Sequence, residues 1–399
     1  MNILNFMEKL LAGVDVGWIP LGEIGEFIRG NGMQKKDFVE VGFPAIHYGQ
    51  IYTKYGLSAE KTFTFVTAEL ASKLKKAKKN DLLLATTSEN DEDVVKPLAW
   101  LGEKTAISGD MMLLRHSQNV KYLAYYFQTN MFQEQKRKYI TGAKVRRVSS
   151  GDLAKIVAPI PCPENPKKSL EIQAEIVRIL DAFTELTAEL TAELNLRKKQ
   201  YNHYRDQLLS FDEGEVEWKT LGKIALINTG QKPSEILDEA TDFDYINAGT
   251  TRSGYTAGSN CEGDTVTTPS RGQGGIGFVG YQKEAFWLGP LCYKMRSLDE
   301  TILVNKYLFY FLQSKKKLLL GLKKEGGVPA VNKSDLAKLE IPVPPLSRQE
   351  HIVTILDNFH TLTSSISEGL PREIELRQKQ YEYYRDLLLS FPNQETLTV

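Results

Sequence analysis

The chain has 399 residues, with 50 lysines and arginines balanced by 50 aspartates and glutamates. This length predicts two to four domains. Three scattered cysteines argue against a disulfide framework, and we find neither a run of eighteen apolar residues nor a basic leader before an apolar core. We therefore expect a cytoplasmic protein without a membrane span or a signal peptide.

The zero net charge hides a segregation along the chain. Residues 18–160 and 218–345 carry net charges of +6 and +3, whereas residues 161–217 and 346–399 carry −5 and −3. Basic blocks joined by acidic segments suggest that the blocks meet a polyanion and that the segments meet protein. Ordinary scatter of charge is the alternative explanation.

The N-terminus predicts a helix stub over residues 1–17, because residues 10–18 resemble residues 208–218, which end a long helical pattern. Each of these stretches ends in a Trp that begins the same motif, WIPLGEI at Trp18 and WKTLGKI at Trp218. We therefore expect two tandem units, each a globular domain followed by a long helix, in a nearly cyclic arrangement.

The first globular domain is expected over residues 18–161. Short apolar runs between polar turns predict strands at 43–48, 81–86, 96–101 and 111–114, and a helix follows from residue 122 to beyond residue 132. The domain closes on VRRVSSGDLAKIVAPIP, which predicts a final strand that ends in proline and leads into the long helix.

The central segment, residues 162–217, carries one narrow apolar stripe. Its apolar positions alternate steps of four and three, which is the heptad pattern of a coiled coil. No Gly or Pro occurs from residue 173 to 210, so one helix of roughly 57 Å is possible. Such a helix needs a partner. In this copy the predicted pairing residues are Ile176, Leu180, Phe183, Leu190, Leu194, Tyr201 and Leu208.

The second globular domain is expected over residues 218–345 and is richer in Gly and Thr. Strands are predicted at 243–248, 277–281 and 291–295, with a helix at 306–313. The domain closes on VPAVNKSDLAKLEIPVP, which shares Asp-Leu-Ala-Lys with the end of the first domain at an offset of 183. Between these matching ends the two domains differ, as expected of one scaffold that presents two different recognition surfaces.

The distal segment, residues 346–399, repeats the central one. Residues 173–187 and 349–363 share nine of fifteen residues, and residues 197–211 and 377–391 share eleven of fifteen. The repeated helices are the obvious partners of one another. Four extra residues around Gly369 and Pro371 should kink or split this second copy. Its predicted pairing residues are Ile352, Leu356, Phe359, Tyr381 and Leu388.

No catalytic or metal-binding constellation is found in the sequence. There is no phosphate-binding GxxxxGK[ST], no ordered CxxC pair for zinc and no Asn-Pro-Pro-aromatic tetrapeptide, and the five histidines are dispersed. The glycine-rich run at 272–277 does not match the spacing of a dinucleotide loop, and no helix is expected after it. We therefore expect neither catalysis nor a bound cofactor in this chain.

The remaining candidates suit nucleic acid. In the second domain, two loops place an arginine among hydroxyls and glycines, where the backbone can approach DNA closely and the guanidinium can bind guanine. Tight strand-joining loops with incidental arginines are the alternative. The candidates are Thr250, Thr251, Arg252, Ser253, Tyr255, Ser270, Arg271, Gln273 and Asn332.

In the first domain, the strongest candidates are the basic residues of the loop at 142–150. Two lysine runs, at 73–79 and 315–317, are more typical of a solvated helix surface than of phosphate contact. The candidates of this domain are Lys35, Lys36, Tyr48, Gln50, Thr86, Thr87, Ser88, Lys144, Arg146 and Arg147.

The chain resembles the specificity subunit of a type I restriction-modification enzyme. The resemblance covers nearly the whole chain and rests on the two unlike domains, on the WxxLG motif that begins each, and on the repeated helices with RKKQYNHYRDQLLSF and RQKQYEYYRDLLLSF. The Thr-Ala-Glu-Leu unit at 187–190 and again at 191–194 is similar to a spacer repeat of some family members.

The resemblance implies an α+β fold with two mixed α/β target-recognition domains, joined by two long antiparallel coiled-coil helices in a pseudo-twofold, near-cyclic arrangement. Each domain would recognise one half of a bipartite site in double-stranded DNA, and the helices would set the gap. It also implies two modification subunits, which use S-adenosylmethionine, and two motor-nuclease restriction subunits, which use ATP and Mg. The resemblance does not give the bases that are recognised.

Two other classes remain open. One is a coiled-coil scaffold without a role in DNA binding. The other is the recognition half of a single-chain restriction enzyme, which would require methylase and nuclease motifs that are absent from the sequence.

Overall fold

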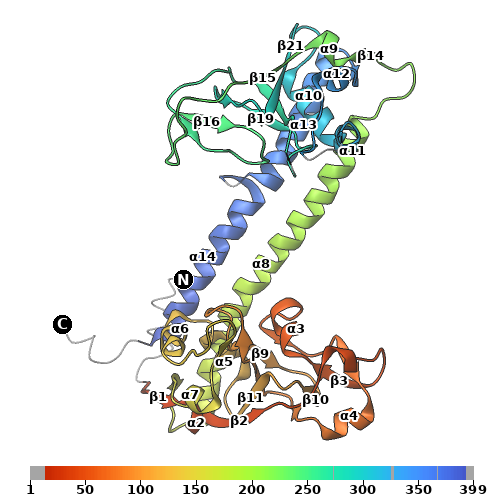
Figure 1. Ribbon diagram of the computed structural model, residues 1–399. Helices are drawn as coiled ribbons and strands as arrows, with labels where there is room; N and C mark the ends of the chain where they lie inside the picture. Colours follow the sequence, from red (N-terminus) through yellow and green to blue (C-terminus); the bar gives the residue numbers. More distant parts are fainter. Residues whose placement is uncertain (1–13, 273, 325–327, 366, 392–399) are drawn as a thin grey trace, which may run out of the picture. The chain divides into compact units, whose positions relative to one another are not determined.

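The computed structural model describes residues 14–391 except 273, 325–327 and 366. Residues 1–13 of the expected N-terminal helix stub therefore lie outside the described part, as does Gln273. The chain divides into two compact units: unit 1 comprises Met1–Glu189 and Ile374–Val399, and unit 2 comprises Leu190–Glu373 (Figure 1). Each unit thus contains part of both long helical segments, and each is described by itself below.

In unit 1, the first and last strands of the globular domain lie side by side. Strand β1 (Val16–Pro20) pairs antiparallel with β13 (Val157–Pro161), so the chain enters and leaves the domain at one place. Helix α2 (Leu21–Ile24) follows, and a Cβ added at Gly22 would lie 2.9 Å from the Cβ of Ala154. The Gly of the WxxLG motif therefore permits this close approach.

Two main sheets form most of the rest of the domain in unit 1. The larger has the order β2 (Gly25–Arg29), β11 (Met111–His116), β7 (Leu82–Ala85), β9 (Lys96–Trp100), β4 (Ser58–Ala59). The smaller has the order β5 (Thr64–Val66), β3 (Phe43–Ile46), β10 (Thr105–Ile107), β6 (Lys76–Ala77). The short elements are η1 (Lys35–Asp37), α3 (Tyr48–Thr53), α4 (Ala68–Lys73), β8 (Thr87–Ser88), α5 (Val120–Tyr126), α6 (Asn130–Arg137), β12 (Arg146–Arg147) and α7 (Ser150–Leu153).

Unit 2 repeats this plan with fewer strands. Strand β14 (Glu217–Thr220) pairs with β22 (Glu340–Val343), helix α9 (Leu221–Ile224) follows, and a Cβ at Gly222 would again lie 2.9 Å from the Cβ of an alanine, Ala337. The sheets have the orders β15 (Ala225–Thr229), β21 (Cys292–Ser297), β18 (Thr265–Pro269), β19 (Gly280–Gln282) and β17 (Tyr255–Thr256), β16 (Phe243–Ile246), β20 (Trp287–Leu288). The helices are α10 (Asn305–Ser314), α11 (Lys316–Gly321) and α12 (Lys333–Leu336).

The long helices match the predicted pattern. Helix α8 runs without interruption over Pro166–Leu208, which confirms the uninterrupted first copy. The second copy is split into α13 (Leu346–Ser364) and α14 (Gly369–Ser390). Gly369 has φ +77, and a Cβ there would lie 2.4 Å from the carbonyl oxygen of Thr361. The predicted break at Gly369 is therefore confirmed.

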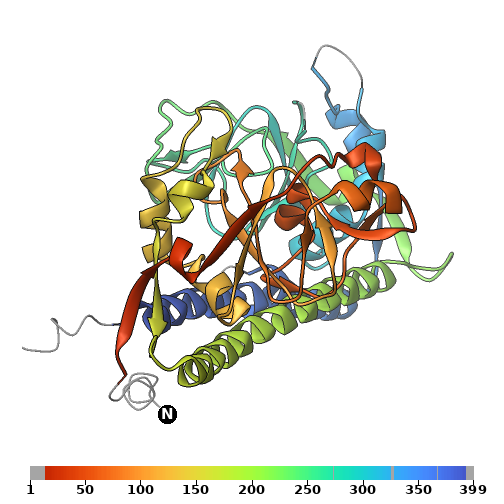
Figure 2. The ribbon, with the colours of Figure 1, turned by 90° about the horizontal axis from the view of Figure 1, so that it is seen from below.

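In unit 1, the segments of α8 and α14 lie side by side and run in opposite directions (Figures 1 and 2). Phe183 stacks on Tyr384 with ring centroids 5.3 Å apart. Ile176, Leu180, Tyr381 and Leu388 are buried in a core that also includes the globular domain. These stripe residues therefore pack the helices against the domain as well as against each other.

In unit 2, Phe359 of α13 stacks on Tyr204 of α8 at 5.7 Å, as its counterpart does in unit 1. Ile352 and Leu356 are buried in the core of the second domain, and Tyr201 and Leu208 pack against that core. Leu190 and Leu194, in the Thr-Ala-Glu-Leu repeat next to the boundary between the units, are half-buried, and their pairing stays a prediction.

Several element boundaries differ from the sequence-based expectation, and side-chain capping or backbone geometry explains three of these differences. The strand expected at 43–48 ends at Ile46, because His47 Nδ1 accepts the amide of Gly49 and begins α3. The helix expected after residue 122 is two helices, because Thr129 Oγ1 accepts the amide of Phe132 and caps α6. The strand expected at 277–281 begins at Gly280, because Gly277, at φ +87, lies in a turn.

Candidate nucleic-acid interface

In each unit a small group of polar side chains connects the globular domain to its long helix. This group, called the joint below, consists of an aspartate and a glutamine of the long helix and their partners on a helix of the domain. In unit 1, Asp181 of α8 accepts a hydrogen bond from Tyr125 Oη at 2.7 Å and pairs with Lys121 Nζ at 2.5 Å. The buried side chain of Gln173 accepts the amide of Asn119 at 2.9 Å and so caps the helix that carries both partners. Burial raises the pKa of Tyr125, which keeps its hydroxyl a donor.

Unit 2 has the same joint. Asp357 of α13 accepts from Tyr310 Oη at 2.5 Å and pairs with Lys306 Nζ at 2.8 Å, and buried Gln349 accepts the amide of Val304 at 2.9 Å. Burial also raises the pKa of Tyr310. The frame that holds each domain on its helix is therefore duplicated down to single hydrogen bonds.

The helix of the other repeat contributes a further contact in each unit. Tyr381 Oη donates to Gln128 Oε1 at 2.9 Å in unit 1, and Tyr201 Oη donates to Gln313 Oε1 at 3.2 Å in unit 2. The sequence predicts these two tyrosines as helix-pairing residues, and the hydrogen bonds to Gln128 and Gln313 are an additional contact. The two aspartates of the joints were missed, although the identical Ile-Leu-Asp of both copies was a signal that could have identified them.

A short ladder, formed by β8, β12 and the backbone at Thr141, precedes the exit strand β13 of unit 1. It brings together two groups of candidate DNA-binding residues. Strand β12 pairs antiparallel with β8, with Arg146 opposite Ser88 and Arg147 opposite Thr87. On its other side, Arg147 exchanges two backbone hydrogen bonds with Thr141, both 2.9 Å long. The arginines of the loop at 142–150 thus lie next to the hydroxyl run at 86–88.

Unit 2 contains the same ladder at the same place. Arg271 forms an antiparallel bridge with Ala330, and Ala330 pairs on its other side with Lys324. Ala330 and Lys324 lie 183 residues after Arg147 and Thr141, the offset that relates the two Asp-Leu-Ala-Lys motifs. Arg271 therefore takes the place that Thr87 has in unit 1. Buried Ser270 and exposed Asn332 flank this ladder.

An acidic loop lies against the ladder of unit 1. Arg146 forms an ion pair with Asp91 at 2.7 Å and donates to the carbonyl oxygen of Gly142 at 2.5 Å. Asp91 lies in the loop at 89–93, which contains four carboxylates. Lys136, 1% exposed, donates to the carbonyl oxygens of Glu92 and Val94 and fixes this loop, and burial lowers the pKa of Lys136 to about 8.

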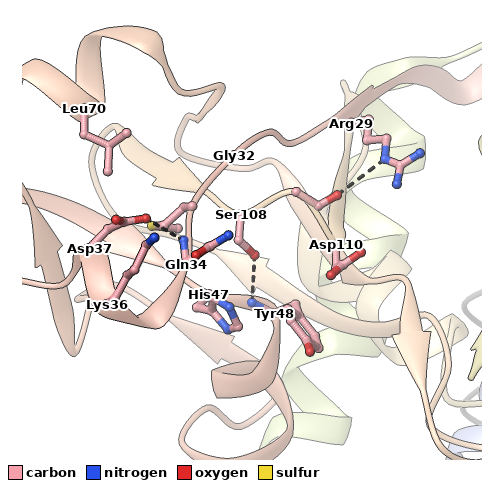
Figure 3. Close-up of a pocket in the computed structure, with 12 residues that line it drawn as sticks. Arg29, Gly32, Gln34, Lys36, Asp37, His47, Tyr48, Leu70, Ser108 and Asp110 are labelled. Carbon is pink, nitrogen blue, oxygen red and sulfur yellow. Dashed lines mark hydrogen bonds between the residues drawn. The ribbon is translucent and has the colours of Figure 1, made fainter.

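A cavity of about 590 Å³ in unit 1 includes two further candidates, Lys36 and Tyr48 (Figure 3). The cavity opens beyond the ends of the parallel strands β3 and β10, where the amide of Tyr48 donates to Ser108 Oγ at 3.0 Å. Arg29 and Asp110 also line it. Its walls thus carry charges of both signs.

The other candidates of the first domain differ in accessibility. Gln50 is buried and its Oε1 accepts the amide of His47 at 2.9 Å, while buried Thr86 donates to the carbonyl oxygen of Asp110 at 3.1 Å. Lys35 and Lys144 are exposed. The first two side chains have structural partners inside the domain, whereas the lysines can reach a ligand.

The loop at 249–255 in unit 2 holds its arginine in place. Arg252 pairs with Asp244 at 3.0 Å, and its guanidinium lies 4.1 Å from the ring centroid of Tyr255. Thr250 and Thr251 line a cavity of about 480 Å³, and the amide of Ser253 donates to the carbonyl oxygen of Tyr245. For Arg252 to bind DNA, it would have to exchange a carboxylate partner for the ligand.

Among the residues that the structure describes, no three His, Cys, Asp or Glu side chains gather in a way that could hold a metal ion. The helices within the same residues also include none with the length and apolar character needed to cross a membrane.

Comparisons with known proteins agree on one family. The model of the type I restriction modification DNA specificity domain matches residues 14–197 and again residues 213–376. The chain is 39% identical to the specificity subunit of the Escherichia coli type I restriction enzyme EcoR124I/EcoR124II, over the full length of both. It is 30% identical to a putative type I specificity subunit of Haemophilus influenzae, with 98% of this chain and 99% of the relative covered.

Solved structures show the same fold. The specificity subunit of the M. genitalium type I system superposes with a TM-score of 0.58 at 17% identity, covering 96% of this chain and 97% of that one. A chain from a structure of the assembly and conformational transition of a type I system gives a TM-score of 0.63 at 16% identity, covering 94% and 97%.

Proposed function

The chain belongs to the family of type I restriction-modification DNA specificity subunits, and on that premise we propose that each of its two units recognises one half of an asymmetric, bipartite DNA site. A single observation carries the proposal. The joints between domain and helix are the same in both units, whereas the loops that the domains present are unlike. A shared frame with two different surfaces suits a target with two different halves.

As a specificity subunit, the chain acts in a complex with DNA and other restriction-modification subunits. We propose that two modification subunits dock on the long helices and supply S-adenosylmethionine for the methylation of adenine. Two restriction subunits would add the motor and nuclease activities that use ATP and Mg. In this arrangement the chain itself performs no catalysis, and the assembly works in the cytoplasm.

The Thr-Ala-Glu-Leu repeat at 187–194 would set the gap between the half-sites. It lies in the middle of α8, and the boundary between the units falls between Glu189 and Leu190. One more unit of four residues adds about 6 Å of helix, compared with about 3.4 Å per base-pair step along a strand. The length of this segment is therefore expected to control the length of the unrecognised gap.

The test is an insertion of one more Thr-Ala-Glu-Leu unit after Leu194. Mapping methylated adenines across the genome of the host should show a gap that is about one or two base pairs longer, with both half-sites unchanged. A matched control replaces Thr191 with Ala at constant length and should keep the original gap. An unchanged gap in the insertion variant, or altered half-sites, would refute the proposal. Failure to bind any duplex in a salt-dependent way would favour a scaffold without DNA binding.

A further inference from the structure

We propose that the short ladder contacts DNA bases in both units, through Arg147 in unit 1 and Arg271 in unit 2. The proposal rests on the proposed function and deepens it, because it assigns one contact element to each half-site. It separates these two arginines from Arg146 and Arg252, which are equally basic in the sequence.

The two arginines leave the same face of equivalent ladders. Residues directly opposite one another on an antiparallel pair project from one face of it. Arg271 lies opposite Ala330, which is the counterpart of Arg147, so the guanidinium in unit 2 projects from the face that carries Arg147 in unit 1. The ladder of each unit thus carries one arginine on the same face. In unit 1 this arginine belongs to β12, and in unit 2 it belongs to the strand that faces the counterpart of β12.

Both side chains are free to bind a ligand. Arg147 and Arg271 are exposed, and neither has an ion-pair partner within the part of the chain that the structure describes. Arg146, the neighbour of Arg147, points to the other face because successive residues of a strand alternate. There it is held by Asp91. Arg146 is therefore a positioning residue that fixes the acidic loop against the ladder.

Hydrogen bonds from buried or half-buried groups hold the ladder backbone next to each arginine. In unit 1, Tyr52 Oη donates to the carbonyl oxygens of Ala85 and Thr87, at 3.2 and 2.9 Å. In unit 2, Tyr293 Oη donates to the carbonyl oxygen of Val331 at 3.0 Å, and the amide of Val331 donates to the carbonyl oxygen of Ser270. Such support positions a base-contacting side chain accurately, because the backbone that carries it is already ordered before DNA binds.

Arginine suits this position because its planar guanidinium donates two parallel hydrogen bonds to O6 and N7 of guanine. A phosphate contact would use the same charge without distinguishing sequences. The two possibilities predict different results, because loss of a base contact relaxes one position of one half-site, whereas loss of a phosphate contact weakens binding to every duplex.

The experiment compares Arg147→Ala, Arg271→Ala and the control Lys104→Ala, each as the full chain in complex with its modification subunits. Lys104 is an exposed lysine of unit 1 that lies outside the ladder. The probes are a duplex with the site mapped from methylated adenines of the wild-type host and a scrambled duplex of the same length. We expect Arg147→Ala and Arg271→Ala to lower affinity for the mapped duplex about 5-fold to 150-fold. Base-resolved methylation should then relax at one position, in a different half-site for each variant. Lys104→Ala should keep every recognised position.

Three results would overturn the proposal. Arg147→Ala or Arg271→Ala could weaken the mapped and the scrambled duplex by the same factor, could leave both half-sites unchanged, or could relax the same half-site. These results leave the proposed function intact as long as the wild-type complex discriminates between the two duplexes. If the wild-type complex does not discriminate, the proposed function itself fails, and the assignment of the ladder with it.

Discussion

Units 1 and 2 are most alike where the domain meets the helix and least alike after the ladder. At the joint, Asp181 and Asp357 each hold one tyrosine and one lysine of a capped helix. After the ladder, unit 1 continues into a loop with four carboxylates at 89–93, whereas the segment at 272–279 in unit 2 has none and is rich in glycine. The comparison indicates that the joint orients each domain and that the loops distinguish what the domains bind.

The largest expected difference between the two units is in how the free energy of unfolding depends on pH. His116 at the end of β11 is largely buried, its Nδ1 accepts the amide of Gln118, and Nε2 has no partner in the described residues. Burial lowers the pKa of His116 to about 4, although the carboxylate of Asp81, which is paired with Arg115, acts in the opposite direction. The corresponding residue of unit 2, opposite Ala225, is Ser297.

Because the pKa of His116 is lowered in the folded state, its contribution to stability is fully present above the unfolded pKa of about 6.5 and is lost as the pH falls through about 4. Unit 1 should therefore lose up to about 3 kcal/mol over this range relative to His116→Ser, and unit 2 should not. Urea unfolding of variants that keep only Trp100 or only Trp287 measures the two units separately. Equal pH dependence of wild type and His116→Ser would contradict this explanation.

A smaller effect is expected at the joints. Asp181→Ala and Asp357→Ala each leave a tyrosine hydroxyl and a lysine without their acceptor, and should destabilise the affected unit by about 1–3 kcal/mol. Since the joint orients a domain on its helix, both variants should also methylate sites whose gap is one base pair longer or shorter. The half-sites should stay the same.

Mapping of methylated adenines measures this spread of gap lengths, and Glu185→Ala, an exposed position of the same helix, serves as the control. A single gap length in both joint variants, despite a measured loss of stability, would show that the joints stabilise the domains without setting their orientation.

Much of the frame could be predicted because it depends on local patterns and on repetition. The heptad stripe of α8 and the break at Gly369 follow from neighbouring residues, and the matching ends of the domains follow from the duplicated motifs. The first residues of α3 and α6 could not be placed, because the capping side chains of His47 and Thr129 interrupt an apolar pattern that continues past them.

The site could be predicted only as a set of separate segments. The candidates at 86–88 and 146–147 are about sixty residues apart in sequence, and their pairing into one ladder depends on the tertiary fold. The same holds for Asp91, which distinguishes Arg146 from Arg147, and for Asp244, which neutralises Arg252. Sequence identifies arginines among hydroxyls, but it does not show which of them already have a partner.

The most direct test of the account is a genome-wide map of methylated adenines in a host that carries the wild-type chain with its modification subunits. Two unlike domains on one duplicated frame predict a single motif with two different half-sites and a constant gap. A contiguous motif, or a palindrome with two identical halves, would contradict the account.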